Sequence, residues 1–133
     1  MANAGPIRVL LVEDNAAISR ELRDLLGRYA NIEIVGEAPD GEEGVLKASQ
    51  LEPAVVVMDI AMPRMNGITA TRLIKVNCSD TAVIGLSVIT QRNTLDAMLK
   101  AGAAEIVSKE EAVDHLYGAI LRAVGSHSSE FYT

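Results

Sequence analysis

The stretch Val55-Val-Val-Met-Asp-Ile-Ala-Met-Pro-Arg-Met-Asn-Gly67 decides the fold that the sequence predicts. Its first four residues are apolar and mostly β-branched, which is typical of a strand that is covered on both faces of a parallel sheet. Pro63 and Gly67 then predict a loop, and the segment 68–76 is predicted to be a helix. A buried strand that leads through a loop into a helix is the repeating unit of α/β folds.

The same unit recurs along the whole chain. Strands are predicted at residues 7–12, 32–37, 54–58, 82–86 and around 106–107. Helices are predicted from Asn15, which would act as the N-cap, and then at about 41–52, 68–76, 93–101 and 113–124, the last one stopping at Gly125. Five strands that alternate with five helices predict a doubly wound parallel sheet with helices on both faces.

Length and composition predict one globular domain. The chain has 133 residues, 49% of them hydrophobic, and a net charge of −6, which disfavours direct binding to nucleic acid or anionic membranes. Cys78 is the only cysteine, so no internal disulfide can form, and the first apolar run (7–12) is too short for a signal peptide or a membrane span. We predict a cytoplasmic protein with a loose leader at 1–6, a domain at 7–125 and a linker or tail at 126–133.

Acidic side chains follow two of the predicted strands. Glu13 and Asp14 come directly after the first strand, and Asp59 follows the third. In open parallel sheets, ligands bind beyond the carboxyl ends of the strands. Carboxylates after strands often only solvate a loop or cap a helix, but Asp59 is flanked by apolar residues, where an unpaired charge is costly. If the two strands are neighbours, the three carboxylates meet and favour a hard divalent cation, Mg²⁺.

Two further polar side chains are predicted at the same edge. Ser87 follows the fourth strand, and Lys109 follows the fifth. A hydroxyl and an ammonium beside a bound cation would suit a dianionic group such as a phosphoryl group. A single lysine is usually a surface residue, so the prediction depends on the combination and not on Lys109 alone.

Four segments together resemble the receiver domain of two-component response regulators. They are Val12-Glu-Asp-Asn15, Val57-Met-Asp-Ile-Ala-Met-Pro-Arg-Met-Asn-Gly67, Leu86-Ser87 and Gly102-Ala-Ala-Glu-Ile-Val-Ser-Lys-Glu110. The resemblance extends from about residue 7 to residue 125, and it implies a flavodoxin-like fold with strand order 2-1-3-4-5, an order for which a chemotaxis receiver is a standard example.

The resemblance also implies a role for each matching residue. Asp59 matches the phosphoacceptor, and it is expected to be ionised at neutral pH and to need no general base. Asp14 matches a direct Mg²⁺ ligand, Glu13 a ligand that acts through water, and Ala61 a position whose backbone carbonyl binds the metal. Ser87 and Lys109 match the groups that contact the phosphoryl oxygens. The chain would accept a phosphoryl group from a sensor histidine kinase and would not itself be an enzyme with a separate substrate.

The attached output is a separate prediction. The segments around 36–44, 58–68 and 108–110 resemble receivers of the NarL/LuxR-type subgroup, which precede a helix-turn-helix DNA-binding domain. The final segment Ser126–Thr133 reads as the start of a linker to such a domain, and DNA would be bound only through that domain. The alternative is a stand-alone receiver that acts through protein contacts. Homodimers are expected through the face of the fourth helix, fifth strand and fifth helix, or through the first and fifth helices.

Three other functions fit the sequence less well. A flavin-binding module would need a hydroxyl- and glycine-rich loop after the first strand, where Glu13 and Asp14 would repel the phosphate. An aspartyl phosphatase usually has a second Asp at the position of Ala61 and a cap domain. A receiver-like module without phosphorylation would lack Asp14, Asp59 or Lys109, and all three are present.

The sequence departs from the receiver pattern at two positions. Ile106 replaces an aromatic residue that usually turns inward on activation, so we expect a switch that works without an aromatic gate. Glu110 replaces the proline that usually follows the lysine. A cis bond before a residue other than proline costs about 3 kcal/mol, and we therefore expect the backbone at Lys109–Glu110 to be strained or rearranged.

Overall fold

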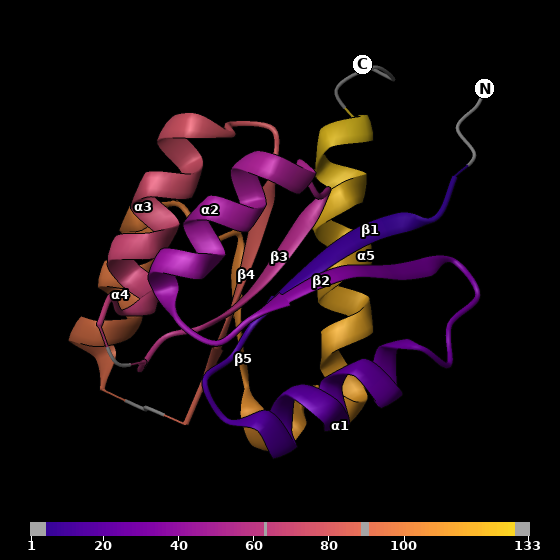
Figure 1. The fold of residues 1–133 in the computed structure, drawn as a ribbon, viewed down its shortest axis with the longest axis horizontal. Coiled ribbons are helices and arrows are strands. Elements are labelled where there is room, and N and C mark those ends of the chain that lie inside the picture. The colour runs from indigo at the N-terminus through magenta and orange to yellow at the C-terminus, as the bar shows by residue number, and fades with distance from the viewer. Residues whose placement is uncertain (1–4, 63, 89–90, 130–133) are drawn as a thin grey trace.

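The computed structural model describes residues 5–62, 64–88 and 91–129, and Figure 1 shows their arrangement. One parallel sheet has the strand order β2-β1-β3-β4-β5, as expected from the resemblance. The elements in chain order are β1 (Ile7–Val12), α1 (Ala16–Leu26), β2 (Ile32–Ala38), α2 (Gly41–Leu51), β3 (Val55–Asp59), α3 (Gly67–Asn77), β4 (Ala82–Ser87), α4 (Arg92–Ala101), β5 (Glu105–Ser108), the 3₁₀ helix η1 (Lys109–Glu111) and α5 (Ala112–Ser129).

The last helix is longer than the sequence predicts. The other helices and strands begin within two residues of their predicted bounds, but α5 continues past Gly125 to Ser129. The prediction that this helix stops at Gly125 was wrong, because a glycine inside a helix costs only about 1 kcal/mol relative to alanine and does not by itself end it. Of the predicted linker or tail at 126–133, residues 126–129 belong to α5, and residues 130–133 lie outside the described part of the chain.

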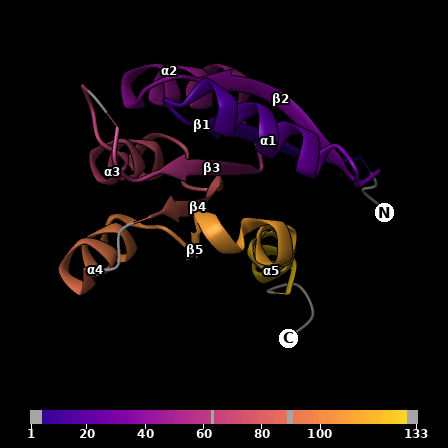
Figure 2. The ribbon, with the colours of Figure 1, turned by 90° about the horizontal axis from the view of Figure 1, so that it is seen from below.

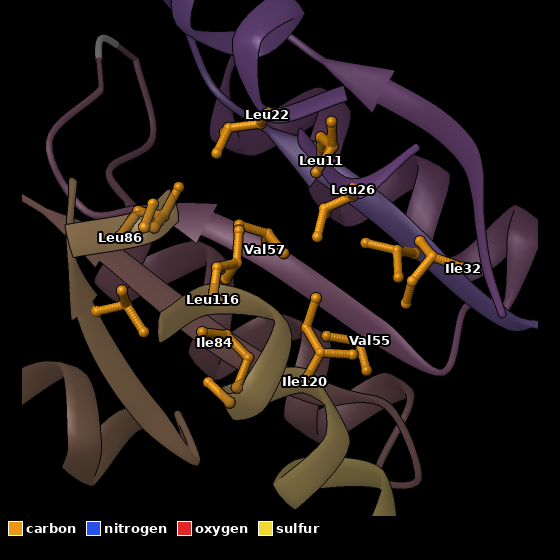
Figure 3. Packing of buried hydrophobic residues seen from close by; sticks show 14 of the residues in the cluster. Leu11, Leu22, Leu26, Ile32, Val55, Val57, Ile84, Leu86, Leu116 and Ile120 are labelled. Carbon is orange, nitrogen blue, oxygen red and sulfur yellow. The ribbon is translucent and has the colours of Figure 1, made fainter. Parts of the chain in front are cut away.

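Two hydrophobic cores lie on opposite faces of the sheet. Helices α1 and α5 cover one face, and α2, α3 and α4 cover the other (Figures 1 and 2). Side chains alternate along each strand, so Val57 packs beneath Leu116 and Ile120 of α5 (Figure 3), whereas Val56 belongs to the core under α2, α3 and α4. Because both faces are covered, the strands are apolar nearly throughout, and polar side chains are confined to their ends. None of the described helices is both long enough and apolar enough to cross a membrane.

Asn15 caps the helix that follows β1, as predicted. Its side-chain oxygen accepts hydrogen bonds from the backbone N–H groups of Ala17, at 2.9 Å, and Ile18, at 3.1 Å. These bonds fix the chain directly after Glu13 and Asp14. We expect Asn15→Ala to lower the free energy of unfolding by about 1 kcal/mol in urea denaturation. Substitution by aspartate, which can accept the same bonds, should have a much smaller effect, and equal losses in both variants would contradict the capping role.

Candidate functional site

Three carboxylates meet at the carboxyl edge of the sheet. Strands β1 and β3 are neighbours, with Val12 opposite Met58, so the residues that follow Val12 lie beside Asp59. One oxygen each from Glu13, Asp14 and Asp59 lies within 4.8 Å of the others. The sequence prediction that these side chains converge is confirmed by this geometry.

The backbone around the cluster is held by its neighbours. The N–H of Glu13 donates to the carbonyl of Ala38, at 3.0 Å, and the N–H of Ile60 donates to the carbonyl of Leu86, at 3.1 Å. Glu13 and Asp59 are each only 3% exposed, whereas Asp14 is exposed. The cluster therefore has two buried carboxylates and one that is open to solvent.

Lys109 lies between the two buried carboxylates. Its Nζ is 2.9 Å from Glu13 Oε1 and 3.3 Å from Asp59 Oδ2. Both oxygens are ion-paired with Lys109 and have no further hydrogen-bond partner among the described groups. Glu13 Oε2 accepts a hydrogen bond from the N–H of Asn15, at 3.1 Å. The sequence predicted that Lys109 reaches this edge, but not that its shorter contact is with Glu13.

The environment changes the protonation of Asp59. Burial, together with the nearby charge of Glu13, raises the pKa of Asp59 from 3.8 to about 7, and Lys109 opposes this only in part. Although burial acts against a charged ammonium, contact with Glu13 and Asp59 raises the pKa of Lys109 above its usual value. The expectation that Asp59 is fully ionised at neutral pH is therefore wrong for the protein without a bound cation.

The carboxylate cluster fits a divalent cation. Two buried carboxylates and a third exposed one exceed the single positive charge of Lys109, and this ammonium is the sole described partner of two of the buried oxygens. Oxygen ligands of this kind, with one side open to water, are those that Mg²⁺ prefers. Glu13, Asp14 and Asp59 are the residues that could hold the cation, which would relieve the repulsion among them.

The other two predicted site residues, Ser87 and Ala61, lie at or just after the ends of β4 and β3, which are neighbouring strands. Ser87 ends β4, is buried and stands opposite Ser108 of β5. Ala61 lies two residues after Asp59, in the loop between β3 and α3, and its side chain is exposed. Its side chain therefore plays no part in the cluster, which agrees with a position where only the backbone carbonyl would matter.

The backbone at Lys109 and Glu110 is rearranged and not strained. Every described peptide bond is trans, and the only described residues other than glycine with positive φ are Glu52 and Arg64. Lys109 to Glu111 form the 3₁₀ helix η1, where Ser108 Oγ accepts a hydrogen bond from the N–H of Glu110, at 3.2 Å. A capped helical turn thus replaces the usual proline, and of the two expected outcomes the structure has the rearranged one.

Comparison with known proteins identifies the family. Residues 9–121 match the family model described as the response regulator receiver domain. A protein-glutamate methylesterase/protein-glutamine glutaminase of a Nocardioides species is 42% identical over 106 residues, which cover 77% of this chain and 29% of that protein. The chain thus spans less than a third of the length of this relative.

The solved structures that share this fold include two kinds of response regulator domain. The response regulator domain of Thermotoga maritima CheB is 33% identical, with a TM-score of 0.84, and the match covers 90% of this chain and 97% of that one. A LuxR-family response regulator from an Aurantimonas species is 26% identical, with a TM-score of 0.87 and coverage of 92% and 87%. The predicted LuxR-type subgroup is therefore supported only in part, since relatives of higher identity are methylesterases. What all of these matches share is the domain itself, and the chain belongs to the response regulator receiver domain family.

Proposed function

We propose that the chain is a phosphoacceptor whose Asp59 takes a phosphoryl group from a phosphohistidine on a sensor histidine kinase. The observation that carries this proposal is the buried Asp59 carboxylate, which lies against Glu13, Asp14 and Lys109 at the carboxyl edge of the sheet. A bound Mg²⁺ would supply positive charge to the phosphoryl oxygens and to the cluster. That charge would also favour the ionised form of Asp59, which is the nucleophile.

The transfer needs little covalent chemistry from the protein. An oxygen of Asp59 forms a bond to phosphorus while the bond from phosphorus to the donor nitrogen breaks, and the electron pair leaves with the imidazole, which takes up a proton. The product is an acyl phosphate. Catalysis of such a step is mostly alignment and charge neutralisation. Lys109 would neutralise the negative charge on one phosphoryl oxygen, and the Ser87 hydroxyl would donate a hydrogen bond to another.

The proposal is tested with a small phosphodonor. The protein is incubated with acetyl phosphate in the presence of Mg²⁺ or of EDTA, and its intact mass is measured. We expect one added phosphoryl group in the presence of Mg²⁺ and none with EDTA. A protein that gained no phosphoryl group in either condition, despite a folded circular dichroism spectrum, would refute the proposal.

The output of the phosphorylated chain has three candidates, of which one is a stand-alone receiver that acts through protein contacts. Resemblance to LuxR-family receivers supports a DNA-binding transcriptional regulator, in which DNA is contacted only by an attached helix-turn-helix domain. The higher identity to methylesterase receivers supports control of an attached methylesterase domain. The gene sequence beyond Thr133 distinguishes the candidates. A helix-turn-helix segment would support the transcriptional regulator, a methylesterase segment the control of that enzyme, and a stop codon the stand-alone receiver, and each result would contradict the other two.

Helix α4 is the element that we expect to change on phosphorylation. It buries only Met98 and Ala101, and its N-cap residue Gln91 makes no side-chain capping bond. Ile106 provides no aromatic side chain to turn inward. Adding beryllofluoride and Mg²⁺, which mimic the phosphoryl group, should shift amide NMR signals from Ser87 through Leu99. Shifts confined to residues around Asp59 would contradict an output through α4.

A further inference from the structure

The loop between β3 and α3, of which the structure describes residues 60–62 and 64–66, contacts the start of α2 through Arg64 and Met65. The contact is closest at Gly41, the first residue of α2. A Cβ atom placed on Gly41 would lie 2.2 Å from the carbonyl oxygen of Met65. Since that oxygen belongs to the backbone, it cannot rotate away, and any side chain at position 41 would push the loop outward.

A second contact joins the same two segments through charge. Asp40 is 6% exposed, and its Oδ1 accepts a hydrogen bond from the N–H of Glu43, at 2.9 Å, as the N-cap of α2. Its other oxygen, Oδ2, is 3.4 Å from Nη1 of Arg64. Arg64 has a φ of 66°, a left-handed conformation that is unfavourable for a residue with a Cβ. The ion pair with Asp40 favours this conformation, although the Arg64 side chain is largely exposed.

The two ends of the loop, at Ile60 and Gly67, are also held together. The N–H of Gly67 donates to the carbonyl of Ile60, at 2.8 Å, and a Cβ on Gly67 would lie 2.2 Å from the carbonyl oxygen of Asp59. Met65 also packs against the core under α2, α3 and α4. The backbone from Met65 to Gly67 is thus held between α2 on one side and Asp59 and Ile60 on the other.

We propose that Asp40, Gly41 and Arg64 are positioning residues that set, through Met65 and Gly67, where the backbone of Asp59 lies relative to Asp14. None of the three belongs to the carboxylate cluster, and they act through the backbone of the loop. The inference rests on the proposed function, in which Mg²⁺ is held beside Asp59. Residues that orient metal ligands affect metal affinity even though they do not bind the metal.

The test compares two glycines of the same helix. The three atoms nearest to a Cβ on Gly44 would be side-chain atoms of Val12, the closest at 3.0 Å, and none of them belongs to the loop. Mg²⁺ affinity is measured by calorimetric titration for the parent protein, Gly41→Ala and Gly44→Ala, and stability by urea denaturation. We expect Gly41→Ala to bind Mg²⁺ about tenfold more weakly. Gly44→Ala should lose stability but keep its affinity.

Two further variants keep the proposal testable if Gly41→Ala does not fold. Arg64→Ala retains a Cβ and so leaves the backbone strain in place while removing the charge, and Asp40→Asn retains the capping oxygen. Both should weaken Mg²⁺ binding severalfold, and Arg64→Lys should recover part of the loss. Affinities equal to the parent value in Arg64→Ala and Asp40→Asn would overturn this inference alone. A parent protein that bound no Mg²⁺ would overturn the proposed metal site and this inference with it.

Discussion

Replacing Asp59 by asparagine is expected to abolish phosphoryl incorporation from acetyl phosphate. The substitution keeps the size of the side chain but removes the nucleophilic carboxylate that lies against Lys109 and the other two acids. Glu13 is also buried against Lys109 and the other two acids, so the assignment to Asp59 rests on its match to the phosphoacceptor position of receiver domains. Intact-mass measurement after incubation with acetyl phosphate and Mg²⁺ should therefore show the unmodified mass only.

The matched control is Asp80→Asn. Asp80 is exposed and lies just before β4, at the opposite edge of the sheet. This variant should be phosphorylated at the rate of the parent protein. Incorporation in Asp59→Asn at the parent rate would show that another residue is the acceptor, and the assignment of Asp59 would then be wrong.

The fold could be predicted from the sequence because its strands are covered on both faces. A segment such as Val55–Asp59 is apolar at every position until its last residue, and this pattern separates strands from the amphipathic helices between them. The same pattern predicted the acidic cluster, since an acidic residue directly after a buried strand must lie at the carboxyl edge. Strand order, in contrast, came from the family resemblance and not from periodicity.

Contacts between segments that are distant in the chain were not predictable. Nothing in the spacing of Glu13 and Lys109 indicates that they approach to 2.9 Å, because the contact depends on how β5 ends relative to β1. The raised pKa of Asp59 likewise depends on its burial in three dimensions. The sequence predicts a helix from about residue 41, but the contact of Gly41 with Met65 depends on the packing of α2 against the loop.

Stability without added divalent cation is expected to fall as the pH rises from about 4 to about 7. The pKa of Asp59 is 3.8 when unperturbed and about 7 in the folded protein, so the folded protein binds the proton more tightly than the unfolded chain. Asp59 therefore favours folding below pH 4, and this contribution is lost as the pH rises through 7. The raised pKa corresponds to a loss on the order of 4 kcal/mol. Urea denaturation in EDTA across this pH range measures it.

Two comparisons separate this effect from the titration of other groups. Asp59→Asn should remove the pH-dependent loss, so its stability should exceed that of the parent protein at pH 8 and not at pH 4. Millimolar Mg²⁺ should raise the stability of the parent protein at pH 8, because a cation that binds only the folded state adds its binding free energy to folding. The same Mg²⁺ should have little effect at pH 4, where protonated Asp59 is a poor ligand. Parallel stability curves for the parent and Asp59→Asn proteins would contradict a folded-state pKa near 7, since a carboxylate that was already ionised would leave no proton to lose in this range.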